Sequence, residues 1–110
     1  DWPVDLQLGV PSAVILRAAR RLHAALIVMG LRRHRRVDRL THDETTLHVM
    51  RGASCPVLGV TEELHTLPGC ALVGVDFSAG SARAATTAAR LLADRGTLVL
   101  AYVERDAVAR

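Results

Sequence analysis

Hydrophobic residues in this chain gather in short runs that alternate with longer stretches of mixed polarity. The apolar runs cover residues 26–29, 57–60, 70–75 and 97–103. Their length, their Val, Ile and Leu content and the Gly or Pro residues near their ends predict β-strands. Because apolar residues are nearly unbroken within each run, the strands are typical of a parallel sheet covered on both faces.

The stretches between these runs carry apolar residues at helical spacing. Residues 13–24 form the first predicted helix, with Ser12 as its expected cap. A second helix is expected from Thr41 to about residue 51, and a third from Ser78 to about residue 94. Both end near a glycine, which commonly terminates helices.

Two further segments complete the predicted fold. Residues 4–8 alternate apolar and polar, which predicts an edge strand before the first helix. Residues 62–69 have few periodic apolar positions and predict a linker. The chain is therefore expected to be α/β, Rossmann-like or flavodoxin-like, with a mostly parallel sheet, right-handed crossovers and helices on both faces.

Composition narrows the function classes. The 110 residues are 50% hydrophobic, and the net charge of +3 does not by itself indicate nucleic-acid binding. No apolar run approaches the ~20 residues that span a bilayer, so we expect no membrane association. Cys55 and Cys70 are too few for a disulfide framework or a zinc site and indicate free thiols in a reducing cytoplasm. The histidines lack metal-ligand spacing and the serines lack a nucleophile elbow, so we expect no enzyme.

A cluster of arginines follows the first apolar run. It consists of Arg32, Arg33, Arg35, Arg36 and Arg39. One interpretation is a clamp for the phosphates of a nucleotide or an RNA. The other is a solvated loop that Asp38, Asp43 and Glu44 partly neutralise. A narrower hypothesis is that Arg33 pairs with Asp43 or Glu44. No aromatic residue interleaves the arginines, so there is no platform for stacking bases, and nucleic acid is not an expected partner.

Two sets of motifs together resemble the universal stress protein family. The first set is Gly9-Val10-Pro11, Leu-Ile-Val-Met-Gly at 26–30 and Cys-Pro-Val-Leu-Gly-Val at 55–60. It is similar to the carboxyl-terminal half of a family module. The second set is Leu-Val-Gly-Val-Asp-Phe-Ser at 72–78 and Leu-Val-Leu-Ala-Tyr-Val-Glu at 98–104. It is similar to the amino-terminal half.

The resemblance therefore divides the chain into three parts. Residues 1–61 are expected to be the carboxyl-terminal half of one module, 62–69 a linker, and 70–110 the amino-terminal half of a second or permuted module. This order is that of a tandem protein. Alternatively, the halves pack together as a circular permutant or exchange with a second copy.

The family resemblance also implies a site for ATP or AMP. Nucleotide-binding members carry Gly-x2-Gly-x9-Gly-Ser/Thr, in which the glycines let the backbone approach phosphate. Here Gly30 matches the first position, but Arg33 occupies the second, and Asp43 and Glu44 occupy the last two. Two carboxylates at a phosphate position indicate weak ATP binding or none.

The second half keeps more of the expected nucleotide site. Asp76 matches the family's aspartate at the adenine end of the nucleotide, and Val103 matches the residue whose backbone meets adenine. Simpler interpretations remain open: Asp76 caps the following helix through neighbouring N–H groups, and Gly30 is a turn glycine. Candidate nucleotide-binding residues are thus Asp76, Val103, Gly30 and Arg33.

Three functional hypotheses follow. The leading one is a non-catalytic, cytoplasmic stress-response module with a degenerate phosphate loop and no cofactor, which self-associates in a dimer-like manner or pairs with another module of the family. The first alternative is a universal stress protein that binds ATP or AMP through Asp76, Val103 and Gly30. The second alternative is a structural interaction module of a longer protein.

Overall fold

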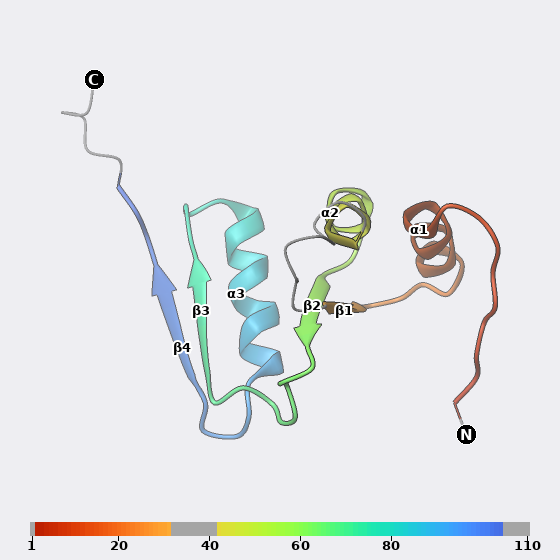
Figure 1. The fold of residues 1–110 in the computed structure, drawn as a ribbon. Helices are drawn as coiled ribbons and strands as arrows, with labels where there is room; N and C mark the ends of the chain where they lie inside the picture. Colours follow the sequence, from red (N-terminus) through yellow and green to blue (C-terminus); the bar gives the residue numbers. More distant parts are fainter. Residues whose placement is uncertain (1, 32–41, 105–110) are drawn as a thin grey trace. The chain divides into compact units, whose positions relative to one another are not determined.

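The computed structural model describes residues 2–31 and 42–104 and contains alternating helices and strands (Figure 1). In chain order these are α1 (Pro11–Arg21), β1 (Ile27–Leu31), α2 (His42–Gly52), β2 (Val57–Thr61), β3 (Cys70–Gly74), α3 (Ala79–Leu91) and β4 (Thr97–Ala101). All strand pairs are parallel, which confirms the α/β prediction. The chain divides into two compact units, Asp1–Leu64 and His65–Arg110.

The first unit is built on a parallel pair of strands. β1 pairs with β2 in the register Ile27 to Val57, and α2 packs on both strands while α1 packs on α2. Ile27 and Val49 are buried in this unit. At the end of α2, a Cβ on Gly52 would lie 2.7 Å from Cδ1 of Leu16, so the missing side chain lets α1 approach closely.

The second unit repeats the strand-helix-strand arrangement. β3 pairs with β4 in the register Cys70 to Thr97, α3 packs on both strands, and Val73 is buried. Ser78 caps α3 as predicted, because its hydroxyl accepts a hydrogen bond from the Ser81 N–H at 3.2 Å. Two backbone bonds, from Ala93 N–H to the Pro68 carbonyl and from Thr97 N–H to the Gly69 carbonyl, tie residues 68–69 to this unit.

Two predictions at the amino terminus are wrong. Residues 4–8 form no strand, because no strand in the described part of the chain pairs with them, and Val4, Leu6 and Leu8 are about nine-tenths exposed. Ser12 does not cap α1: Val10 takes the cap position without a side-chain bond, and Pro11 is the first helical residue. Proline suits that position because its missing N–H would have no partner there.

The other elements agree with the predictions to within a few residues. Residues 62–69 form no helix or strand, and their first residues turn through a bond from the Leu64 N–H to the Thr61 carbonyl. The expected cap Thr41 lies outside the described residues. No helix in the described part of the chain combines the length and apolar character needed to cross a membrane.

Candidate functional site

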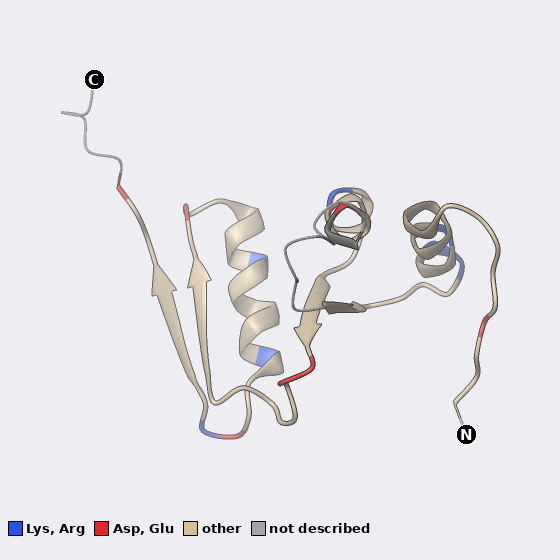
Figure 2. Cartoon of the chain, viewed as in Figure 1, with Lys and Arg blue, Asp and Glu red and all other residues tan. Residues whose placement is uncertain are grey.

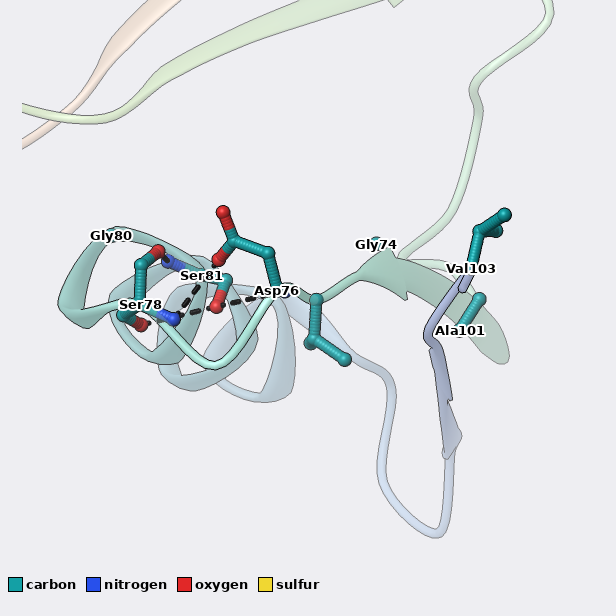
Figure 3. A pocket seen from close by; sticks show the side chains of 8 residues that line it. Gly74, Asp76, Ser78, Gly80, Ser81, Ala101 and Val103 are labelled. Atoms are coloured by element: carbon teal, nitrogen blue, oxygen red, sulfur yellow. Dashed lines mark hydrogen bonds between the residues drawn. The ribbon is translucent and has the colours of Figure 1, made fainter. Parts of the chain in front are cut away.

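An open pocket lies at the carboxyl ends of β3 and β4, where parallel sheets commonly place ligands (Figure 3). Its volume is about 520 Å³. Small and polar side chains surround it: Gly74, Val75, Asp76, Ser78, Gly80, Ser81, Ala101 and Val103. The pocket therefore contains two of the four predicted site residues, Asp76 and Val103.

Asp76 is held in place by the start of α3. Its Oδ1 accepts a hydrogen bond from the Ser78 N–H at 3.0 Å, and its own N–H donates to Oγ of Ser81 at 3.4 Å. Hydrogen bonds from the Ser78 side chain, then from the Ser78 backbone and the Ser81 side chain, lower the pKa of Asp76. Asp76 is therefore a carboxylate near neutral pH.

The second oxygen of Asp76 points away from this turn (Figure 3). The bond from the Ser78 N–H is the local turn contact expected if Asp76 only supports the helix start. Because just one of the two carboxylate oxygens is used in that contact, the other retains the ability to accept a hydrogen bond from a ligand. The two interpretations of Asp76 are compatible.

Val103 lines the same pocket from the end of the neighbouring strand. It follows β4 by two residues and is 82% exposed. The strands stay paired up to this point, since the Val75 N–H donates to the Ala101 carbonyl at 2.8 Å. An exposed valine beyond the last ladder bond leaves its backbone available to a ligand.

Three residues near the pocket were not selected from the sequence. Ser81 donates through Oγ to the Ser78 carbonyl at 3.0 Å and completes the turn around Asp76. Phe77 and Tyr102 lie with ring centroids 5.0 Å apart and tilted by 47°, and Phe77 has a left-handed backbone with φ of 64°. The signals were the Ser-x-x-Ser spacing and two aromatic residues, Phe77 just after one predicted strand and Tyr102 near the end of the other.

The remaining predicted site residues belong to the other part of the chain. Gly30 lies in β1 of the first unit, and a Cβ added there would meet no atom within 4 Å. Arg33, like the rest of the arginine cluster, lies outside the described residues. The predicted helix after the loop is confirmed as α2, with Asp43 and Glu44 in its first turn and Glu44 exposed.

The described residues contain no candidate metal site. No group of three or more His, Cys, Asp and Glu side chains there is arranged to hold a metal ion. Cys55 and Cys70 are both free thiols. The pocket's own chemistry is that of hydrogen-bond acceptors and donors beside small apolar groups.

Comparison with protein families gives one match. Residues 2–61 match the universal stress protein family. No curated protein and no solved structure proved similar to the chain. The matched range contains α1, β1, α2 and β2.

Proposed function

The chain belongs to the universal stress protein family, and from this premise we propose that it is a non-catalytic stress-response module with weak or no ATP binding. The carrying observation is the composition of the first turn of α2 inside the matched range. Glu44 is exposed there, one residue after Asp43. The family's phosphate loop has Gly and Ser or Thr at these positions.

Electrostatics explains why this turn disfavours a triphosphate. Carboxylates are stable at a helix amino terminus because of the helix dipole, and their negative charge opposes the binding of a second anion there. Like charges ~4 Å apart repel by ~4 kcal/mol at an effective dielectric of ~20. Even a part of that energy exceeds the ~1.4 kcal/mol that corresponds to a tenfold loss of affinity.

In this proposal the module acts through association in the cytoplasm. It self-associates, or it pairs with another universal-stress-type module. The support is that the strands expose large apolar side chains: Val28 is 55% exposed, Leu72 70% and Leu100 56%. Apolar surface of this kind on a strand indicates a protein contact.

The pocket at β3 and β4 favours a second candidate function. In this version the protein binds ATP or AMP, with Asp76 and Val103 at the adenine end and Gly30 at the phosphates. The specific observation is that Asp76 and Val103 line one pocket and that a carboxylate oxygen of Asp76 faces away from the turn. AMP is the more suitable ligand because it brings fewer phosphates to the acidic turn.

Titration with ATP and AMP, followed by thermal unfolding, separates the two functions. Ligand at a hundredfold over its Kd adds ~2.7 kcal/mol of stability, which raises the Tm of a domain of this size by several degrees. The leading proposal expects no shift at millimolar ATP. A clear shift with ATP that Asp76→Asn removes would establish the second function instead.

A restored loop provides the matched control. The triple variant Arg33→Gly, Asp43→Gly, Glu44→Ser returns the loop to the family pattern and is expected to gain an ATP-dependent shift. The control variant Glu62→Ser removes one carboxylate outside the loop and is expected to behave like the parent. If the triple variant shows no ATP-dependent shift in Tm, then Arg33, Asp43 and Glu44 are not what prevents phosphate binding.

A further inference from the structure

The solvent-facing side of α1 is basic. The sequence of this helix contains no Asp or Glu, and its exposed residues are Pro11, Ala13, Arg17, Arg20 and Arg21. The three arginines are spaced by three and four residues, so their side chains share one face of the helix. Figure 2 shows basic residues toward the end of α1. These three residues are called the arginine face below.

The apolar residues of α1 pack within the first unit. Leu16 lies against the end of α2, where a Cβ on Gly52 would be 2.7 Å from the Cδ1 of that leucine. Val14, Ile15 and Leu16 are half-buried, in contrast to the exposed arginines. The arginine face is therefore the side of α1 that is left for a partner.

The helix dipole accounts for only part of the arginine face. Basic residues are favourable beside the carboxyl end of a helix, and Arg20 and Arg21 lie in the last turn of α1. Arg17 lies before that turn, where the dipole has little effect. Within the part of the chain that the structure describes, no hydrogen bond or ion pair engages the side chains of Arg17 and Arg20. Their guanidinium donors are thus available to an acceptor from another molecule.

A carboxylate of the chain itself already occupies part of this face. Oδ2 of Asp5 accepts a hydrogen bond from Nη2 of Arg21 at 2.5 Å, and Oδ1 of Asp5 accepts one from Gln7 at 2.6 Å. The side chains of Asp5 and Arg21 are 49% and 57% exposed. Exposed ion pairs contribute little to stability, so a carboxylate from another molecule can replace Asp5.

The contact with Asp5 indicates what kind of ligand the face accepts. The carboxylate belongs to residues 2–8, which form neither helix nor strand. Arg17 and Arg21 are ~6 Å apart along the helix axis, at ~1.5 Å per residue. Alternate residues of an extended chain are ~6.6 Å apart. Acidic side chains at every second position of an extended segment therefore match the spacing of the arginines.

Nucleic acids and membranes match the face less well. The exposed residues of α1 include no aromatic ring on which a base could stack. Helices that lie on a membrane expose a wide apolar face next to their basic residues. In α1 the large apolar residues are half-buried, so an acidic protein segment is the better match.

We propose that the arginine face of α1 binds an extended acidic segment of a partner protein, and that Asp5 competes with this segment for Arg21. Carboxylates of the partner pair with Arg17 and Arg20 directly, and a further one reaches Arg21 when Asp5 is displaced. This inference goes beyond the proposed association with another module of the family, because it names the chemistry of a partner and the surface that receives it. All the residues involved belong to the first unit, and no nucleotide takes part.

Fluorescence anisotropy of the full chain with a labelled peptide of four Glu-Ser repeats tests the proposal. The peptide is expected to bind the parent, whereas the uncharged peptide of Gln-Ser repeats is not. The double variant Arg17→Gln, Arg20→Gln should weaken binding about tenfold, since it removes two ion pairs. Asp5→Asn should tighten binding about two- to fivefold, because the internal competitor is lost. A gain of affinity cannot result from a folding defect.

Matched variants on α3 separate this face from general charge attraction. Arg83→Gln, Arg90→Gln removes two other exposed helical arginines, and Asp94→Asn removes one other exposed carboxylate. Both are expected to bind the peptide like the parent. Equal changes in the α3 variants, or an Asp5→Asn protein that binds no more tightly than the parent, would overturn the proposal.

Two further probes distinguish the class of partner. A single-stranded RNA of eight nucleotides and vesicles of phosphatidylserine and phosphatidylcholine are each expected to bind more weakly than the acidic peptide. Tighter binding of either one, lost in Arg17→Gln, Arg20→Gln, would assign the face to that ligand and overturn the proposal. These measurements contain no ATP, so their failure is distinguishable from failure of the proposed function.

Discussion

Asp76, Ser78 and Ser81 form a compact hydrogen-bonded turn at the start of α3. Each of the three uses a short polar side chain to satisfy a backbone N–H that the helix itself leaves unpaired. The turn fixes the carboxylate of Asp76 at the pocket edge and the hydroxyl of Ser78 over the helix end. Local stability and the candidate site therefore depend on the same few atoms.

The cap of α3 gives a residue-scale prediction. Ser78→Ala removes the hydroxyl that accepts from the Ser81 N–H, and such losses cost about 1 kcal/mol. Urea unfolding of the full chain should show this decrease in the free energy of unfolding. Thr86→Ala is the control: its hydroxyl bonds to the Ala82 carbonyl inside α3, where such a bond adds little, so stability should stay equal or rise. Equal losses in both variants would contradict the capping role.

The lowered pKa of Asp76 predicts a pH dependence. A carboxyl whose pKa is lower in the folded than in the unfolded state stabilises the fold above its unfolded pKa of about 3.9. That stability is lost as the pH falls through the folded pKa. Asp76→Asn should therefore be less stable than the parent at pH 7, and the difference should shrink toward pH 3.

Unfolding in urea at several pH values measures this difference. Asp94→Asn is the matched control, because the Asp94 side chain makes no hydrogen bond or ion pair with the described residues. The effect of this variant on stability is compared with that of Asp76→Asn at each pH. A difference for Asp76→Asn that does not change between pH 7 and pH 3 would show that its hydrogen bonds do not favour the charged form.

The turn between α3 and β4 packs closely around Gly96. Arg95 has a left-handed backbone with φ of 62°, and the Gly96 N–H donates to the Ala93 carbonyl at 2.9 Å. A Cβ on Gly96 would lie 2.9 Å from that carbonyl oxygen and 3.2 Å from the Gly69 carbonyl oxygen. Both atoms belong to the backbone, so they yield only if the turn itself moves.

Gly96→Ala is accordingly expected to destabilise the chain by about 1–3 kcal/mol, as overpacking does. Gly69→Ala is the control, since a Cβ at Gly69 would meet no atom within 4 Å. Thermal and urea unfolding should separate the two variants clearly. A Gly96→Ala protein as stable as Gly69→Ala would indicate that the turn relaxes at little cost.

How well elements could be predicted depended on where their stabilising contacts lie. The helix start at Ser78 was predictable because its hydrogen bonds are local, to a residue three positions on. The absence of a strand at residues 4–8 was not predictable, because an alternating pattern shows only that a strand can form. Whether it does form depends on a neighbouring strand elsewhere in the chain. The segment instead bonds to α1, because Arg21 donates to Asp5 at 2.5 Å. Within the segment, Gln7 also donates to Asp5, at 2.6 Å.

The candidate site shows the same division. Asp76 and Val103 were predicted because they match motif residues of the resembled family, and the parallel register of β3 and β4 brings them to one pocket. Phe77 was missed, since its left-handed backbone and its contact with Tyr102 arise from the paired strands and not from local sequence.

At the scale of the whole molecule, the small apolar core means that association with another chain would add to the stability of the fold. A chain whose described part buries so few apolar side chains gains stability from covering exposed ones such as Val28, Leu72 and Leu100, at ~25 cal/mol per Å² of apolar surface. If that surface is covered by a second copy, the folded state is favoured by mass action, and the Tm depends on chain concentration.

Calorimetry or circular dichroism at concentrations a hundredfold apart should show a higher Tm in the more concentrated sample. A Tm that is independent of chain concentration would contradict self-association.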